Sequence, residues 1–348
     1  MTQRAIVVAV DTQERGREIE PELAEFEALA QAAGAQVVDR IVQRRDAVDP
    51  ATLVGSGKAA EIAERAKELR ADLLLVLNDL RPRQRKNLEQ VVPLPIVDRT
   101  MLILDVFSRH ARSREGKLQV ELAQLRYRQS NLIGVGADLS RLGGGIGTRG
   151  PGETKLEVDR RRIGERIAAL NRQLEAVRRQ RGVRRAGPRR EPLVALVGYT
   201  NVGKSSLLNA LARTDAYVAD QPFATLDPTI RRAYLAPEVY VRLADTVGFI
   251  TDLPKDLVNA FRATLEELRE ADLLLHVLDA SNPDWPRQRR AVEAILHDIG
   301  LDATPSILTF NKCDVAPAPP AEEGALYVSA RTGAGFPALR AALIERIT

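Results

Sequence analysis

The stretch "LVALVGYTNVGKSSLLNAL", residues 193–211, decides the fold of the C-terminal part of this chain of 348 residues. An apolar run ends at Gly198, and a glycine-lysine-serine sequence then opens a predicted helix. The pattern G-x-x-x-x-G-K-[ST] from Gly198 to Ser205 therefore lies between a strand and a helix, which is the context that a phosphate-binding loop requires. Its backbone N–H groups face phosphate oxygens, Lys204 offers a positive charge to the β and γ phosphates, and the Ser205 hydroxyl is a ligand for Mg²⁺.

A second motif, "DTVG", spans Asp245–Gly248 and follows the predicted strand VYVRLA. Asp245 at a strand end is placed to hold Mg²⁺ through a water molecule, and Gly248 lets its backbone N–H approach the γ phosphate. An isolated D-x-x-G arises often by chance. Its place at a strand end, downstream of a phosphate-binding loop, strengthens the prediction.

The stretch "NKCD", Asn311–Asp314, selects the base. The carboxylate of Asp314 accepts hydrogen bonds from the N1–H and the exocyclic amine of guanine, a pair that adenine does not present. Asn311 is expected to bond the O6 and N7 side of the ring, and Lys312 to lie over the base. "SAR", Ser329–Arg331, is expected to give a backbone N–H to guanine O6. The three motifs in this order predict binding of GTP rather than ATP.

Between the first two motifs lies "DQPFATLDPT", residues 220–229. This is where a mobile loop closes over the γ phosphate, and a threonine hydroxyl there completes the Mg²⁺ shell. Thr225 and Thr229 are both candidates.

Around these motifs, strand and helix patterns alternate over residues 193–348. The expected strands are LVALVG, IRRAYLA, VYVRLADT, DLLLHVLDA, SILTFNK and ALYVSA, and the expected helices cover 203–213, 255–269, 286–299 and 335–347. This alternation predicts an α/β domain with a Ras-like phosphate-binding loop.

Residues 1–113 show the same alternation and predict a second α/β domain. The apolar runs AIVVAV, QVVDRIV, DLLLVLN and PIVDRT are separated by helical patterns, which favours a parallel sheet flanked by helices. The stretch "VGSGKAAEI", residues 54–62, lacks the first glycine of a phosphate-binding loop because Thr52 stands at that position. A plain helix-entry turn is therefore expected there.

Residues 114–182 predict a long antiparallel helical hairpin. Apolar side chains recur at helical period in two segments, the first with Leu118, Leu122, Leu125 and Leu132, and the second with Leu156, Ile163, Ile167, Leu170, Leu174 and Val177. A glycine-rich tip is expected over residues 131–153. A linker rich in Gly, Pro and Arg is expected over residues 183–192.

Charge is segregated along the chain. From Arg81 to Arg190 there are 26 Lys and Arg against 11 Asp and Glu, whereas the rest carries 25 against 36. A basic region of this kind is the footprint of a face that binds a polyanion, although a solvated helix surface gives the same pattern. The single cysteine, Cys313, excludes an internal disulfide framework, and no apolar run is long enough to span a bilayer. A cytoplasmic protein without stable membrane insertion is expected.

The three nucleotide motifs resemble those of the translation-factor-related GTPases, and the whole chain is similar to the HflX family. Five stretches carry the resemblance: LVGSGKAAEI, EGKLQVELAQLRYRQSNL, GGGIGTRGPGETKLEVDRR, GYTNVGKSSLLNAL and FATLDPT. The resemblance implies a monomeric GTPase that binds the large ribosomal subunit and its rRNA, with the hairpin tip reaching the peptidyl transferase region, and that splits or rescues stalled ribosomes. Many family members carry a further C-terminal domain, which is not expected here because the sequence stops at Thr348.

Carried over by position, the resemblance implies a GTP site and a Mg²⁺ site. The glycines and arginines of the hairpin tip themselves predict an RNA contact, because glycines let the backbone lie close to RNA and arginines bond phosphates, although a flexible hairpin turn is the alternative. The GTP site comprises Gly198, Tyr199, Thr200, Asn201, Val202, Gly203, Lys204, Ser205, Ser206, Phe223, Ala224, Thr225, Leu226, Asp227, Asp245, Thr246, Val247, Gly248, Asn311, Lys312, Cys313, Asp314, Ser329, Ala330 and Arg331. Hydrolysis is assigned to Lys204, Thr225 and Gly248, and Mg²⁺ to Ser205, Thr225 and, through water, Asp245. The RNA contact is assigned to Arg141, Gly143, Gly144, Gly145, Arg149 and Gly150.

Two positions bear on the rate of hydrolysis. Phe249 stands where Ras-like GTPases place the glutamine that orients the attacking water, so slow intrinsic hydrolysis and stimulation by the ribosome are expected. Asn201 resembles the asparagine that coordinates K⁺ in potassium-dependent GTPases, although an asparagine there equally braces the loop.

The three histidines, His110, His276 and His297, show no metal-ligand spacing, and His276 within an apolar run is expected in the core. A signalling GTPase with protein partners and no RNA is the alternative function. An RNA-modifying GTPase is disfavoured because no second catalytic centre is evident.

Overall fold

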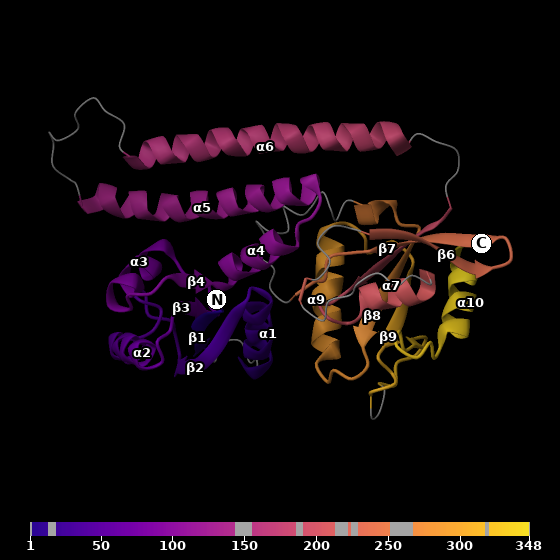
Figure 1. The fold of residues 1–348 in the computed structure, drawn as a ribbon, viewed down its shortest axis with the longest axis horizontal. Coiled ribbons are helices and arrows are strands. Elements are labelled where there is room, and N and C mark those ends of the chain that lie inside the picture. Colours follow the sequence, from indigo (N-terminus) through magenta and orange to yellow (C-terminus); the bar gives the residue numbers. More distant parts are fainter. Residues whose placement is uncertain are drawn as a thin grey trace. The chain divides into compact units, whose positions relative to one another are not determined.

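The structure is a computed structural model that describes residues 2–12, 19–142, 155–185, 191–212, 222–223, 229–250, 267–316 and 320–347 (Figure 1). The chain divides into two compact units. The first comprises Met1–Arg109 and Leu118–Ala176, and the second His110–Lys117 and Val177–Thr348. Within the described residues, no helix is both long and apolar enough to cross a membrane.

The first unit begins with a four-stranded parallel sheet in the order β2-β1-β3-β4. Its strands are β1 (Gln3–Thr12), β2 (Ala35–Arg45), β3 (Leu73–Val76) and β4 (Ile96–Asp98). The connecting helices are α1 (Ile19–Ala32), α2 (Ser56–Glu68) and α3 (Pro82–Val91). The central strands are buried, which explains why they read as continuous apolar runs, and the predicted parallel α/β domain is confirmed.

A helix that the sequence did not separate, α4 (Arg99–His110), follows β4 directly. The side chain of Asp98 begins it, because Oδ1 accepts a hydrogen bond from the Met101 N–H at 2.9 Å. The stretch VGSGKAAEI forms the start of α2, with Gly55 as its N-cap and Lys58 paired with Glu61 at 2.6 Å. The plain helix-entry turn expected there is what the structure shows.

The helical hairpin consists of α5 (Arg114–Leu142) and α6 (Lys155–Arg185), which run side by side in Figure 1. The predicted leucines make the contact: Leu118 and Leu122 form a buried cluster with Leu170 and Leu174, so the two helices are antiparallel. The expected start of the tip at residue 131 is wrong, because α5 continues to Leu142. Residues 131–142 contain no proline and enough apolar and helix-forming residues to propagate the helix. Residues 143–154 lie outside the described part.

A hydrogen-bonded cluster fastens α5 to the N-terminal sheet. The guanidinium of Arg85 donates to Asp98 Oδ2 at 2.5 Å, to the Ile96 carbonyl at 2.6 Å and to the Tyr127 hydroxyl at 2.8 Å. The Tyr127 hydroxyl donates to the same oxygen of Asp98, whose side chain is 2% exposed. Burial and the negative charge of Asp98 raise the pKa of Tyr127, so its hydroxyl stays protonated and remains a donor.

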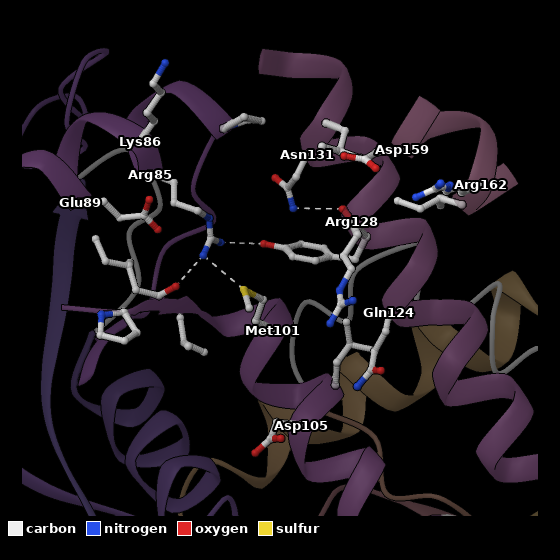
Figure 2. A pocket seen from close by; sticks show the side chains of 18 residues that line it. Arg85, Lys86, Glu89, Met101, Asp105, Gln124, Arg128, Asn131, Asp159 and Arg162 are labelled. Carbon is white, nitrogen blue, oxygen red and sulfur yellow. Dashed lines mark hydrogen bonds between the residues drawn. The ribbon is translucent and has the colours of Figure 1, made fainter. Parts of the chain in front are cut away.

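A cavity of about 940 Å³ lies beside this cluster, between α3, α4 and the helical hairpin. Figure 2 shows Arg85 and Lys86 on one side of it and Asn131 and Arg162 on the other. Most of its lining is apolar. The cationic side chains Lys86, Arg128 and Arg162 at its border are exposed.

The second unit contains a six-stranded sheet in the order β10-β9-β8-β5-β7-β6, in which only the pair β6–β7 is antiparallel. The strands are β5 (Leu193–Gly198), β6 (Thr229–Ala236), β7 (Val239–Asp245), β8 (Leu273–Asp279), β9 (Ser306–Asn311) and β10 (Leu326–Tyr327). The helices are α7 (Lys204–Ala212), α9 (Trp285–Asp298) and α10 (Phe336–Ile347). All six predicted strands and three of the four predicted helices are found.

The fourth helix, expected over 255–269, falls mainly on residues 251–266, which lie outside the described part. Its last residues belong to a 3-10 turn, η2 (Glu267–Glu270). The carboxyl ends of β5, β7, β8 and β9 meet at one edge of the sheet, where ligands bind in open α/β folds.

Candidate functional site

The loop from Gly198 to Lys204 joins β5 to α7 and forms the predicted turn at the start of a helix. Gly203 has a φ of +88°, and a Cβ at this position would lie 2.4 Å from Nδ2 of Asn311. Asn201 adopts the left-handed region with a φ of +62°. The loop and the first turn of α7 therefore present backbone N–H groups at a helix N-terminus, an arrangement that attracts phosphate.

Lys204 lies at the bottom of this loop and is 6% exposed. Its ammonium donates to the carbonyls of Gly198 at 3.1 Å and Tyr199 at 2.8 Å. Burial lowers the pKa of Lys204 to about 8, and the carboxylate of Asp245 opposes that shift. A bound phosphate would compensate the buried charge and raise the pKa again, so the loop holds a cation suited to an anionic ligand.

Ser205 and Asp245 bring together the oxygen ligands expected for Mg²⁺. The Ser205 hydroxyl donates to Asp245 Oδ2 at 2.5 Å, and the Asp245 side chain is buried at the end of β7. Among the described residues, no group of three or more His, Cys, Asp or Glu side chains is placed to hold a metal ion. An ion at this place would therefore also use phosphate oxygens and water, which suits Mg²⁺.

The segment from Thr246 to Phe249 lies directly against the phosphate loop. The Thr246 hydroxyl donates to the Leu196 carbonyl at 2.6 Å. Thr200 N–H donates to the Phe249 carbonyl at 2.8 Å, and Phe249 N–H donates to the Gly198 carbonyl at 3.1 Å. The approach is close enough to require Gly248, since a Cβ there would lie 2.9 Å from the Cα of Thr200.

The side chain of Phe249 points into the core and is 2% exposed. Its aromatic ring has no group that orients water, and its burial places it away from solvent. The expectation that this residue takes no part in activating water agrees with the geometry.

Asn311, at the end of β9, belongs to the NKCD motif and bonds to two other predicted motifs, the phosphate loop and the SAR stretch. Its Nδ2 donates to the Val202 carbonyl at 2.9 Å, and its Oδ1 accepts from the Ala330 N–H at 3.0 Å. The side chain is 2% exposed. Asn311 thus fixes the phosphate loop and the SAR stretch relative to each other, in addition to the contact with the base that the sequence predicts.

Lys312 and Asp314 follow on the same turn. Lys312 donates to Asp279 Oδ2 at 2.6 Å and to the Asn201 carbonyl at 2.8 Å. Asp314 Oδ2 pairs with Arg331 at 2.5 Å. A hydrogen bond with Ser329 and the charge of Arg331 keep the pKa of Asp314 below its usual value, so this carboxylate is ionised and able to accept from guanine.

Of the remaining predicted residues, the structure describes only some. Phe223 is described and 2% exposed, whereas residues 224–228, including Thr225, lie outside the described part. Arg141 has helical backbone in α5, and Gly143, Gly144, Gly145, Arg149 and Gly150 lie outside the described part. Sequence reasoning missed Asp279, although a carboxylate at the end of the buried strand DLLLHVLDA is a signal of the kind used for Asp245.

Three family models match the chain in succession. One described as the N-terminal region of a GTP-binding GTPase matches residues 20–108, and one described as the middle region matches residues 110–187. A third, described as "50S ribosome-binding GTPase", matches residues 193–312. The three matches together extend from residue 20 to residue 312.

Solved structures support the fold alone. A crystal structure of SsGBP in complex with GDP is similar with a TM-score of 0.55 and 23% identity, and covers 99% of this chain and 98% of that chain. A GTP-binding protein from the hyperthermophilic archaeon Sulfolobus solfataricus, also in complex with GDP, is similar with a TM-score of 0.50 and 22% identity over the same shares.

Curated relatives are much closer in sequence. A GTPase HflX of Caldanaerobacter subterraneus subsp. tengcongensis is 49% identical over 347 residues, which cover 99% of this chain and 80% of the relative. The GTPase HflX of Escherichia coli strain K12 is 45% identical, with 99% of this chain and 83% of the relative covered. With 49% and 45% identity to these relatives over 99% of its length, this chain belongs to the HflX family of GTPases.

Proposed function

We propose that this GTPase acts on the large ribosomal subunit, hydrolyses GTP slowly alone and faster when bound there, and splits or rescues stalled ribosomes. The observation that carries the proposal is Phe249, whose buried ring stands at the position from which a polar side chain orients the attacking water. A partner or another loop must therefore order the water. The family model described as a 50S ribosome-binding GTPase supports the large subunit as that partner.

The residues of the site divide the work on GTP. Lys204 and the N–H groups at the start of α7 hold the β and γ phosphates, and the Gly248 N–H donates to the γ phosphate as charge develops there. Ser205 and, through water, Asp245 hold Mg²⁺, which neutralises phosphate charge. Thr225 is proposed to complete the Mg²⁺ shell, and Asp314 accepts from the guanine base.

The basic middle of the chain is proposed to contact rRNA. The segment from Arg81 to Arg190 carries 26 Lys and Arg against 11 Asp and Glu. The proposed contact at the hairpin tip comprises Arg141, Gly143, Gly144, Gly145, Arg149 and Gly150. Contacts of arginine with phosphate release counterions, so binding should weaken steeply as salt is raised.

Sedimentation and hydrolysis assays test the proposal together. The protein, with a non-hydrolysable GTP analogue or with GDP, is centrifuged with separated subunits and with intact ribosomes, and co-sedimentation with the large subunit is expected. Large subunits should raise the rate of GTP hydrolysis at least about tenfold, or about 1.4 kcal/mol of barrier. Equal rates with and without subunits, or no co-sedimentation in either nucleotide state, would contradict the proposal. Sedimentation of the protein alone tests the monomer.

Asn201 is the proposed K⁺ residue. Its left-handed backbone conformation directs its carbonyl to Lys312, so the loop is braced whether or not the side chain binds an ion. Faster hydrolysis in K⁺ than in Na⁺ at equal ionic strength is expected, and Asn201→Ser should remove the difference. Fractionation of cells tests the cytoplasmic location.

A further inference from the structure

Glu191 lies at the point where the linker enters the GTPase sheet, and both its side chain and its backbone bind the β6–β7 pair. Its carboxylate Oε1 accepts hydrogen bonds from Nε of Arg232 at 2.7 Å and from the NH2 group of the same residue at 2.5 Å. Its carbonyl accepts from Nε of Arg242 at 3.0 Å. The next residue, Pro192, accepts from the Arg242 N–H at 2.8 Å.

The two arginines held by Glu191 are direct neighbours across the β6–β7 pair. Arg232 in β6 lies opposite Arg242 in β7 in the antiparallel register, and both face the same side of the sheet. The guanidinium of Arg232 also lies 3.7 Å from the ring centre of Tyr240. One residue of the linker thus holds two adjacent strands at once. We call Glu191, Arg232 and Arg242 the linker clamp.

At the nucleotide site, β6 and β7 each carry a residue of a predicted motif. β7 ends at Asp245, the first residue of the D-T-V-G motif, and β6 begins at Thr229, the last residue of the stretch DQPFATLDPT. Thr229 lies opposite Asp245 in the register. A change in the position of this strand pair therefore reaches the γ-phosphate side of the site through continuous backbone hydrogen bonds.

The ion pair between Glu191 and Arg232 lies at the surface of the protein. The hydrogen bond that Arg232 donates to Glu191 raises the pKa of Arg232, and the ion pair is solvent-exposed, with side chains 59% and 33% exposed. An exposed pair contributes little to stability. The pair of Glu191 with Arg232 therefore has little influence on folding. It is better suited to positioning β6 and β7 than to stabilising the fold.

We propose that the linker clamp is a positioning device: through Glu191 it fixes the β6–β7 pair, and with it the segment from Asp245 to Gly248, in the arrangement that stimulated hydrolysis requires. This inference rests on the proposed stimulation by the ribosome. Among the residues that the structure describes, none of the hydrogen bonds of the clamp reaches a nucleotide motif, so the clamp is expected to affect the stimulated rate and to leave the basal rate unchanged.

Single and double variants of the full chain test the clamp in the hydrolysis assay with large subunits. Arg232→Glu and Glu191→Arg should each lower the stimulated rate about two- to fivefold, the scale of one exposed ion pair. Basal hydrolysis should stay as in the wild type. The double variant Glu191→Arg with Arg232→Glu restores opposite charges and should recover most of the stimulation. Arg231→Ala, an exposed neighbour on the same strand, is the matched control and should change neither rate.

The outcomes separate the clamp from the proposed function. A wild type that large subunits do not stimulate contradicts the proposed function. A stimulated wild type with equally stimulated single variants contradicts the clamp. Single variants that lose basal hydrolysis, or a double variant as impaired as the sum of its parts, also contradict it, because they indicate damage to the fold instead of a lost pair. Urea unfolding followed by the fluorescence of Trp285, the only tryptophan, checks the fold of each variant.

Discussion

His276 makes the stability of the GTPase domain depend on pH. It lies in β8, is 5% exposed, and its Nε2 has no hydrogen-bond partner among the residues that the structure describes. Burial lowers its pKa from 6.5 to about 4; the nearby Glu293 opposes this shift, and Arg289 and Lys204 reinforce it. The expected core position is confirmed.

The sign of the effect follows from proton binding in the two states. Between the native pKa of about 4 and the unfolded value of 6.5, the unfolded chain binds a proton at His276 and the folded chain does not. The contribution of the neutral His276 to the free energy of unfolding is therefore fully present above about pH 6.5, and it is lost as the pH falls towards about 4. The shift corresponds to about 3 kcal/mol over the whole window, and to about 2 kcal/mol on going from about pH 7.5 to about pH 5.

The assay is urea unfolding of the full chain at these two pH values, followed by Trp285. This residue packs edge-to-face on Phe310 with ring centres 5.1 Å apart, so its fluorescence reports the GTPase domain. Protonation of carboxylates also destabilises the chain in acid, and the comparison with a variant isolates the histidine. His276→Leu should reduce the loss by about 2 kcal/mol. His297→Gln, whose native side chain is 75% exposed, should keep the full loss. An equal loss in wild type and His276→Leu would refute the reasoning.

Three further changes have defined outcomes. Gly248→Ala places a Cβ 2.8 Å from Thr200 Cγ2, so it should slow GTP hydrolysis about tenfold or more in a single-turnover assay while GDP binding measured by calorimetry stays close to wild type. Asp314→Asn replaces an acceptor by an amide, and competition binding should show a shift of about a hundredfold from guanine towards xanthine nucleotides; unchanged preference would remove Asp314 from base selection. Tyr127→Phe removes the hydroxyl that bonds to Arg85 and Asp98. This change should destabilise the packing of α5 on the N-terminal sheet by about 1–2 kcal/mol. Hydrogen exchange in α5 near residue 127 should then be faster than in the wild type.

Local patterns predicted much of the fold because their causes are local. The buried strands are continuous apolar runs, the leucines of α5 and α6 recur at helical period, and the phosphate loop needs its glycine and lysine at fixed spacing. The boundary between β4 and α4 was not predicted because the run PIVDRT was assigned whole to a strand, although Asp98 within it is a residue type that begins helices.

The sequence did not predict which residues of the site contact each other across long stretches of chain. The bond from Asn311 to the Val202 carbonyl, the pair of Lys312 with Asp279 and the pair of Asp314 with Arg331 join residues far apart in the chain. Which residues meet at the edge of a sheet depends on strand order, and strand order depends on packing of the whole domain. The same holds for the pairing of Arg85 and Asp98 with Tyr127.

The position of Asn311 has a consequence for how the protein is made. Its side chain joins the carbonyl of Val202 to the N–H of Ala330, so the base pocket closes only after residues more than a hundred positions beyond the phosphate loop have been synthesised. A nascent chain that has displayed its phosphate loop outside the exit tunnel still lacks the means to recognise guanine. Recognition of guanine by this pocket therefore requires that β9 has paired with β10.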